Sequence, residues 1–325
     1  MTRKWFFIGL AAALFSWPVY PQTTGVSFFS STSFINTPVS GTVQIDPNSD
    51  LMVRTGIARY ASKAHVSAGA FGVALCFAKA TDPIATISCT RYASDTCSVG
   101  GSVEFPIPQG CTPPTGTDRS TAVIYTEQDG SVYAGKELDM WLASGSGTSW
   151  TAGVASIIPN IPDGWGTCCT PVGCHCNGGT ASGIAFAAGT LRPEEIAAGV
   201  IPHALAVSSQ SIAPGIACPA THTDARRGGT GLPEGAHFFL PASYNIDAQN
   251  WPEWVKIIAH ALQTYGGYIV DYTGGGLQVQ GFTDANVAIN GGLTWAGVGV
   301  PADSIGDLSL IPWDQMQVEK IVWCN

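Results

Sequence analysis

Residues 136–142 read Lys-Glu-Leu-Asp-Met-Trp-Leu, and this alternation of apolar and polar side chains decides the fold class. Side chains of a β-strand point in turn to the two faces of its sheet. The apolar residues 138, 140 and 142 would then face a core, whereas Glu137, Asp139 and Trp141 would share the opposite face. The stretch predicts a strand that carries two carboxylates and an indole on one side.

Comparable short segments follow one another along the chain, separated by clusters of Gly, Pro, Asn and Asp. Regularly spaced short strands with turn signals between them are typical of β-sandwiches and jelly rolls. We therefore predict a mainly β fold, a β-sandwich or jelly roll, with residues 23–325 forming a single domain. A stretch rich in Pro, Gly and Cys, at about 158–183, is expected to be a long surface loop. Further candidate strands lie at 71–75, 122–125, 131–133 and 183–187.

Three segments carry helix signals. Residues 46–49 (Asp-Pro-Asn-Ser) open a short helix through about residue 55. Residues 252–265 place apolar side chains at helical spacing, with Gly266 as the stop. Residues 191–196 form one more helical turn, with a proline and two acids at its start.

The first residues predict export. Arg3 and Lys4 precede an apolar run at 5–15, which Pro18 and Pro21 end, and this order is typical of a signal peptide. We predict a signal peptide over residues 1–22 and a secreted, extracellular product. The apolar run is about half the length of a membrane-spanning helix, and no later segment is long enough, so no membrane insertion is expected.

The charge of the chain limits the classes of binding partner. Charged residues make up 11% of the chain, the net charge is -9, and no basic run or basic helix is present. Nucleic acid and anionic membrane surfaces are therefore unsuitable partners, because both attract clustered Lys and Arg. The composition favours a neutral or weakly charged extracellular ligand such as a polysaccharide.

Ten cysteines agree with export, because an even number in a secreted chain indicates disulfides. Proximity in sequence suggests two local bridges, Cys76 with Cys89 and Cys97 with Cys111. Residues 168–176 contain four cysteines and a histidine, which would form either disulfides or a zinc site. The oxidising compartment favours disulfides.

The face with Glu137, Asp139 and Trp141 is the first candidate site. An indole stacks on the apolar side of a sugar ring, and a carboxylate transfers protons. We consider Asp139 a candidate catalytic acid and Glu137 and Trp141 candidate substrate contacts. The alternative is an ordinary solvated strand face.

Two histidines come next. His203 shares strand parity with Ile201 and Leu205, so it is either a catalytic base or a hydrogen-bonded core histidine. His222 lies two residues before Asp224 in a polar segment. If that segment is extended, the carboxylate orients the imidazole. Alternatively, Asp224 closes a turn through nearby amides. Arg226, close behind, would neutralise an acidic group of a substrate.

A fourth candidate lies at 266–276, where an apolar strand ends in Asp271 and then glycines. Asp271 is either catalytic or the start of a turn, and Tyr268 is a candidate substrate contact. Other chemistries lack support. The chain contains no G-x-S-x-G elbow of α/β-hydrolases, no phosphate loop and no dinucleotide fingerprint.

The chain resembles a broad family of secreted, mostly uncharacterised bacterial proteins. The resemblance covers nearly all of the predicted mature chain and is most specific from Arg192 to Asp271. It implies one β-sandwich unit with a few helices and brings no established activity. Where family members often have His-Met-Val-Val-Ile-Asp, this chain has Ser-Thr-Ala-Val-Ile-Tyr at 120–125. The shared motifs are FINTP at 34–38, DPNS at 46–49, D-x-W at 139–141, LRPEEI at 191–196, I-x-HAL at 201–205, ATHTD at 220–224, LPEGA at 232–236, ALQTYG at 261–266 and IPWD at 311–314.

Three functions fit these residues. The first is a polysaccharide hydrolase with Asp139 and Asp224 as the acid–base pair, or a lyase with His203 or His222 as base. The second is a non-catalytic glycan-binding or surface protein. The third is a metal-dependent enzyme in which both histidines and Asp224 bind the ion. No cofactor is required by the first, although Asp224 and Asp271 would suit Ca²⁺ and the cysteine cluster Zn²⁺.

Overall fold

The computed structural model describes residues 28–94, 96–159, 179–225, 229–304 and 307–324. The predicted signal peptide, the cysteine cluster at 168–176 and Arg226 lie outside the described residues. No helix within these ranges has the length and apolar character needed to cross a lipid bilayer.

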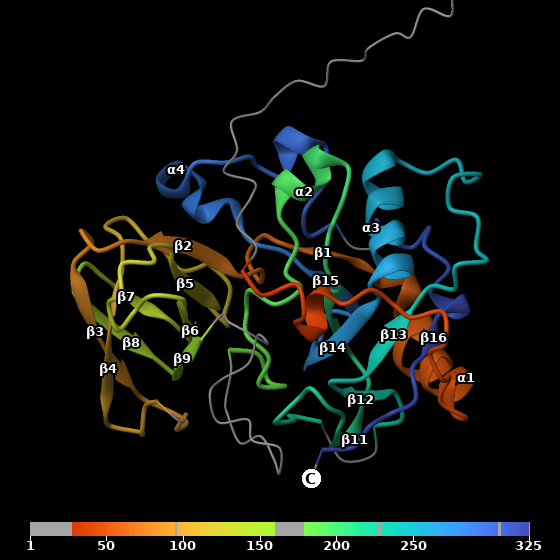
Figure 1. Cartoon of the computed structure of the whole chain (residues 1–325), viewed down its shortest axis with the longest axis horizontal. Coiled ribbons are helices and arrows are strands. Elements are labelled where there is room, and N and C mark those ends of the chain that lie inside the picture. Colours follow the sequence, from red (N-terminus) through yellow and green to blue (C-terminus); the bar gives the residue numbers. More distant parts are fainter. Residues whose placement is uncertain (1–27, 95, 160–178, 226–228, 305–306, 325) are drawn as a thin grey trace, which may run out of the picture.

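The mainly β prediction is confirmed. Within the described residues the strands form four sheets, and their strand orders do not confirm the predicted β-sandwich or jelly roll. Figure 1 shows two lobes: a small lobe of residues 74–159, and a large lobe built from the chain on both sides of it. The small lobe therefore interrupts the large lobe in sequence, between its first strand and all its later ones.

Two four-stranded sheets make up the small lobe. Buried side chains from both sheets fill the space between them, including Ile87, Phe105, Leu138 and Trp150. The outer sheet alternates exposed and buried residues, as a sheet with one solvated face does. The outer sheet contains β3 (Ile84–Cys89), β4 (Ser102–Pro106), β7 (Ser144–Ser146) and β8 (Ser149–Ala152), and the inner sheet β2 (Ala74–Ala78), β5 (Thr121–Tyr125), β6 (Lys136–Trp141) and β9 (Val154–Pro159).

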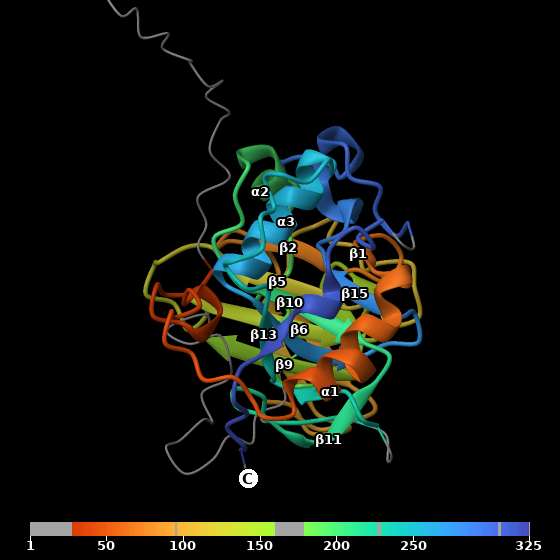
Figure 2. The ribbon, with the colours of Figure 1, turned by 90° about the vertical axis from the view of Figure 1, so that its right-hand side faces the viewer.

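The inner sheet is buried on both faces. All five residues of β5 are buried, and on β6 the four central residues are buried. Its second face packs against residues 184–188 and against one face of the large lobe's main sheet, where Ala206 and Val270 lie. The layers across the molecule are therefore the outer sheet, the inner sheet, the main sheet of the large lobe and a helical layer (Figures 1 and 2).

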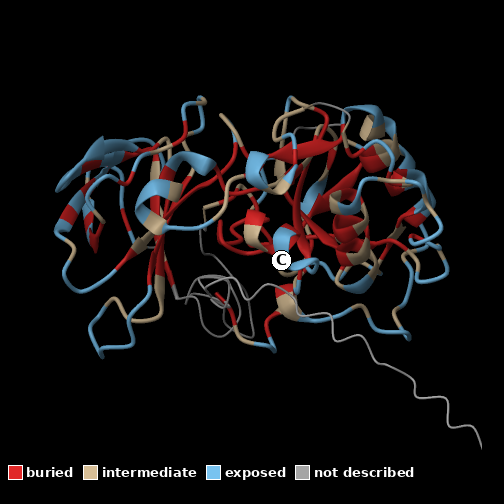
Figure 3. Ribbon diagram, turned by 90° about the horizontal axis from the view of Figure 1, so that it is seen from above, coloured by how far each residue is buried: buried red, intermediate tan, exposed pale blue. Residues whose placement is uncertain are grey.

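The large lobe is built on a six-stranded mixed sheet with the order β1-β15-β10-β14-β13-β16. Its outer face carries the largest core, which includes Val207, Ile269 and the buried side of α3. Figure 3 shows this core and that of the small lobe as two buried regions joined by the central layer. The strands are β1 (His65–Ser67), β10 (Leu205–Ser209), β13 (His237–Phe239), β14 (Gly267–Tyr272), β15 (Leu277–Gln280) and β16 (Gln317–Val318), and a separate pair is formed by β11 (Ile212–Ile216) and β12 (Leu232–Glu234).

The three predicted helices are confirmed. The first begins at Ser49 and extends beyond the expected end at residue 55. The second, α3, has a wholly buried apolar face that includes Val255, Ile258 and Leu262. The helical elements are η1 (Phe34–Asn36), α1 (Ser49–Met52), η2 (Val53–Ile57), η3 (Ala58–Lys63), α2 (Pro193–Ala198), α3 (Glu253–Thr264), η4 (Asp284–Asn286), α4 (Val287–Asn290), η5 (Ala296–Val298) and η6 (Trp313–Gln315).

Two of the predicted strands are absent. Residues 131–133 form turns, and residues 183–187 form a buried irregular segment between the lobes. Both segments contain small residues and a glycine close by, which suit tight turns as well as strands. Residues 183–187 are buried because they fill the space between two sheets.

The disulfide pairing also differs from the prediction. The structure joins Cys76 to Cys111 and Cys89 to Cys97. Neither of the two predicted bridges is therefore present. Cys76 lies on β2 in the inner sheet and Cys89 on β3 in the outer sheet, with their own partners beside them. A third bridge joins Cys218 to Cys324 across the large lobe.

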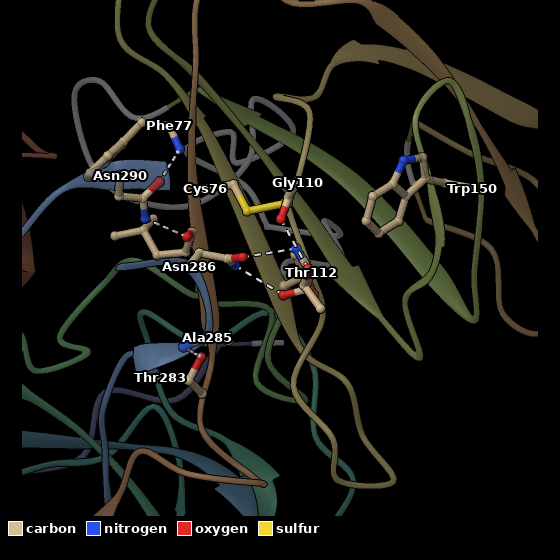
Figure 4. Close-up of a disulfide and its surroundings, with 12 residues drawn as sticks. Cys76, Phe77, Gly110, Thr112, Trp150, Thr283, Ala285, Asn286 and Asn290 are labelled. Carbon is tan, nitrogen blue, oxygen red and sulfur yellow. Dashed lines mark hydrogen bonds between the residues drawn. A yellow bond between two sulfur atoms is a disulfide. The ribbon is translucent and has the colours of Figure 1, made fainter. Parts of the chain in front are cut away.

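Two asparagines fasten the lobes together near the first disulfide (Figure 4). Asn290 at the end of α4 accepts a hydrogen bond from the Phe77 amide and donates one to the Leu75 carbonyl. Asn286, buried, bonds the amide and carbonyl of Thr112 in the same way. Each carboxamide thus satisfies a backbone donor and acceptor of the small lobe from the large lobe.

Candidate functional site

Three carboxyl groups meet in the large lobe. Asp224 lies in the loop after β11, Glu234 is the last residue of β12, and Asp271 lies near the end of β14. One oxygen of each lies within 4.8 Å of the others. Asp224 is exposed, Asp271 is half-buried and Glu234 is fully buried, so the carboxyl cluster runs from the surface into the protein.

A β-bulge orients Asp271. In the parallel pair of β10 and β14, Val207 is opposite Ile269, but the next residue, Ser208, is opposite Asp271. Val270 is therefore the extra residue of β14, and it reverses the side to which later residues point. Val207 and Ile269 lie in the outer core, whereas Ser208 bonds Gln280 on the side that faces the small lobe. The bulge places Asp271 on that side as well.

Two of the three carboxyls, Glu234 and Asp271, resist ionisation. Burial raises the pKa of Glu234 to about 9, and the charges of Asp224 and Asp271 add to the increase. The Thr223 side chain and the Asp224 amide, 3.0 Å from Glu234 Oε2, only partly offset it. Burial, followed by the charges of Asp224 and Asp118, also raises the pKa of Asp271 well above its ordinary range. Glu234 is thus a neutral acid at pH 7.

The small lobe contributes to the surroundings of the cluster. The charge of Asp118 reaches Asp271, and the Asp118 carbonyl accepts the Leu142 amide at 2.7 Å. Next to Leu142, Trp141 stacks on Tyr92, with ring centroids 6.1 Å apart and planes at 23°. The Arg91 guanidinium lies over the Trp141 ring, 5.5 Å from its centre. The aromatic pair of Trp141 and Tyr92 thus lies at the end of β6 and is partly exposed.

Backbone contacts hold the loop that carries Asp224. The Ser182 carbonyl accepts the amides of Thr221 and His222, and the Ser182 amide donates to the Val270 carbonyl. One residue of the 179–187 segment therefore contacts both chain stretches that supply the aspartates. His222 is half-buried, with Nδ1 3.0 Å from Thr221 Oγ1.

Asp139 does not lie on an open face. It is 1% exposed, and its Oδ2 accepts the amides of Gly179 and Phe186, both at 2.9 Å. Glu137, 0% exposed, accepts the Ala187 amide through Oε1. The predicted alternation correctly places Leu138 and Met140 in a core, whereas Leu142 lies beyond the end of β6 and is half-buried. Residues 179–187 cover the side with the carboxyls. Asp271, and not Asp139, therefore lies with Asp224 in the carboxyl cluster.

His203 lies in a separate ionic network. Its Nε2 is 3.0 Å from Glu195 Oε1 and its Nδ1 is 2.8 Å from the Ala204 carbonyl, so both nitrogens face acceptors. Burial opposes ionisation of Glu195, but the charges of His203 and Arg192 prevail and lower its pKa to about 2. Glu195 also caps α2 by accepting the Arg192 amide. The structure thus agrees with the second interpretation of His203, a hydrogen-bonded core histidine.

Tyr268, a predicted substrate contact, lies in the core between the lobes. It is buried, stacks on His237 at 4.5 Å between ring centroids, and meets the edge of Phe34. Burial raises the pKa of its hydroxyl above its ordinary range. Asp224 and Asp271 are therefore the predicted site residues that the structure brings together, with His222 beside them.

Glu234 is the member of the cluster that sequence reasoning did not select. It lies in the segment 232–236, which was noted only for a resemblance. One signal was available: an acid stands between Pro233 and Gly235, just after an apolar residue. Such a pattern indicates a strand that ends at a carboxylate. Its proximity to Asp271 depends on the pairing of a two-stranded sheet beside β14, which no local pattern predicts.

The cluster offers the oxygen ligands that a hard divalent cation prefers. Carboxylate oxygens are the ligands that Ca²⁺ prefers, and three of them within 4.8 Å span the space that such an ion fills. Glu234 Oε1 is buried and has no hydrogen-bond donor among the described groups. The two histidines do not join Asp224 in one metal-binding set within the described residues.

Comparisons of the chain with protein-family models, with curated proteins and with solved structures find no match.

Proposed function

We propose that this protein is a secreted polysaccharide hydrolase whose catalytic carboxyl pair is Asp271, the general acid and base, and Asp224, its ionised partner. The observation that carries the proposal is the set of carboxyl oxygens within 4.8 Å of one another, graded from exposed to buried. A general acid must hold a proton at the working pH, and its partner must be ionised and accessible. Asp271, with its raised pKa, suits the first role, and exposed Asp224 suits the second.

The spacing favours a retaining mechanism. Retaining glycosidases hold their two carboxyl groups about 5 Å apart, whereas inverting enzymes leave more space for a water molecule. Asp271 would protonate the glycosidic oxygen as that bond breaks, while Asp224 forms a bond to the anomeric carbon. Water, deprotonated by Asp271, would then displace Asp224. Buried Glu234 stays protonated beneath the pair and supplies no additional negative charge.

Three features support a glycan substrate. The stacked rings of Tyr92 and Trp141 offer an aromatic surface on the small lobe, and aromatic faces suit the apolar sides of sugar rings. The chain has no basic cluster that would select a polyanion. The three disulfides agree with the oxidising compartment in which extracellular polymers are degraded.

The test measures reducing-sugar release by the purified chain from a panel of neutral and acidic polysaccharides. We expect Asp224→Asn and Asp271→Asn to lower kcat/KM by about 10²–10⁴-fold, the usual contribution of an acid–base group. Asp50→Asn, at an exposed position of α1, is the matched control and should retain wild-type activity. Undiminished turnover in either active-site variant would overturn the assignment. An unsaturated sugar product would indicate a lyase, and glycan binding without turnover a binding protein.

A cation-binding protein is the second candidate, favoured by the buried Glu234 oxygen without a donor. Calorimetric titration with CaCl₂ distinguishes the two candidates. Saturable binding that Glu234→Gln abolishes, together with activity that a chelator removes, would favour a metal-dependent site. Activity that persists in the chelator would favour the carboxyl pair alone.

A further inference from the structure

The second carboxyl pair, Glu137 and Asp139, has no part in the proposed chemistry and yet is fully buried. The two side chains project from the same face of β6, two residues apart. Three of their contacts are backbone amides of one segment: Gly179, Phe186 and Ala187. Unpaired buried charges are costly, so such a pair calls for a physical explanation.

One oxygen of each carboxyl remains without a donor. Glu137 Oε2 and Asp139 Oδ1 are both buried and have no hydrogen-bond partner in the described structure. The residues opposite them on the neighbouring strands are not ionisable, and residues 179–187 contain no ionisable side chain. The large-lobe residues that pack in this core include Ala206, Val270 and Tyr268. The opposite residues are Ala122 and Ile124 on β5, and Ser156 and Ile158 on β9.

We propose that Glu137 and Asp139 share one proton between these two oxygens, and that the pair clamps residues 179–187 so that Ser182 positions the carboxyl cluster. A single proton satisfies both orphaned oxygens, with Glu137 as donor and Asp139 as acceptor. The remaining negative charge rests on Asp139, where two amides already converge. The clamp is a positioning device, since neither carboxyl reaches the surface.

The electrostatics agree with this arrangement. Burial, followed by the charge of Asp139, raises the pKa of Glu137 well above its ordinary range. Burial also raises the pKa of Asp139, to about 6, although Glu137 and the two amides oppose the increase. At neutral pH the pair therefore holds one proton, and its loss would leave two buried charges on neighbouring positions of one strand.

The route from the clamp to the cluster is short. Within the segment, Thr180 bonds the Ile184 carbonyl and the Ser182 hydroxyl, which fixes the turn that presents Ser182. Ser182 then bonds Val270, next to Asp271, and Thr221 and His222, two to three residues before Asp224. The inner sheet of the small lobe and the two aspartates of the large lobe are thus joined through one nine-residue segment.

Hydrogen exchange followed by mass spectrometry on the full chain tests the clamp. We expect Glu137→Ala to increase exchange of residues 179–187 by about tenfold or more, and to increase exchange at Thr221 and His222. Glu137→Gln, whose amide still donates to Asp139, should keep both segments protected. The α3 helix, residues 253–264, serves as the internal reference and should not change.

The pH dependence tests the shared proton. After correction for intrinsic exchange rates, protection of 179–187 in the wild type should decrease as pH rises above neutrality, while in Glu137→Gln it should not. Loss of protection in Glu137→Gln equal to that in Glu137→Ala would overturn the shared proton. Unchanged exchange of 179–187 in Glu137→Ala would overturn the clamp. Neither readout requires hydrolase activity, so either failure is distinct from failure of the proposed function.

Discussion

Glu234 shows how one residue can set the character of a site without reaching the solvent. It is fully buried, yet two aspartates lie within 4.8 Å and an amide donates to it. An ionised carboxylate there would face both burial and two like charges. Glu234 therefore keeps its proton, and folding retains a proton that the unfolded chain releases.

This retention predicts a stability that decreases with rising pH. The folded pKa of Glu234, about 9, lies above its unfolded value of 4.5. Its contribution is complete below pH 4.5 and is lost as pH rises toward 9, by at most about 1.4 kcal/mol per pH unit for one proton. Glu234→Gln removes the titrating group, so its stability should decrease less between pH 5 and 9. Urea unfolding at several pH values, in a chelator, measures the difference.

The comparison needs a surface carboxyl as its control. Asp50→Asn should follow the wild-type pH curve over the same range, because Asp50 is exposed. A Glu234→Gln curve parallel to that of the wild type would show that Glu234 is ionised in the folded protein.

At the scale of elements, β6 illustrates what the sequence could predict. Its alternation correctly placed Leu138 and Met140 in a core. The same alternation suggested an open face for Glu137 and Asp139, because periodicity shows that two faces differ and not what covers them. The second half of the covering segment, residues 183–187, was itself expected to be a strand, since its small residues fit an extended conformation as well as a turn.

The carboxyl cluster was predicted only in part, for a related reason. Asp224 and Asp271 each ended a recognisable segment, so their positions at strand or loop ends could be expected. The bulge at Val270 could not, because one unpaired residue leaves no sequence signal and yet changes the side to which Asp271 points. Glu234 joined the cluster through tertiary pairing alone.

The asparagine junction gives a prediction at this scale. Asn286 exchanges two hydrogen bonds with Thr112 while only 2% exposed. Asn286→Ala would leave a buried backbone amide and carbonyl unsatisfied, at about 1–3 kcal/mol for each lost partner. We expect a decrease of roughly 2–4 kcal/mol in the free energy of unfolding, measured in urea. Exposed Gln315→Ala should change it by less than about 0.5 kcal/mol, as surface substitutions usually do. Equal effects of the two substitutions would contradict the bridging role.

At the scale of the whole molecule, the small lobe divides the sequence of the large lobe. The main sheet begins with β1 before the small lobe, and its other strands follow after it. Long-range bridges should therefore stabilise the molecule more than local ones, because they close larger loops of the unfolded chain.

The three bridges within the described residues rank by sequence separation. Cys218–Cys324 spans 106 residues, Cys76–Cys111 spans 35 and Cys89–Cys97 spans 8. Chain entropy predicts losses of roughly 5, 4 and 2–3 kcal/mol when each pair is replaced by serines. Denaturant unfolding of the three double variants should give that order. The reverse order would show that strain or residual structure outweighs loop closure.

The longest bridge has one more consequence. Asp224, Glu234 and Asp271 all lie between Cys218 and Cys324 in sequence, together with α3 and four strands of the main sheet. A protease that cuts once within this interval produces two pieces that remain covalently joined. In an oxidising environment the nicked protein therefore keeps every part of its carboxyl cluster in one particle, and only a reductant releases the pieces.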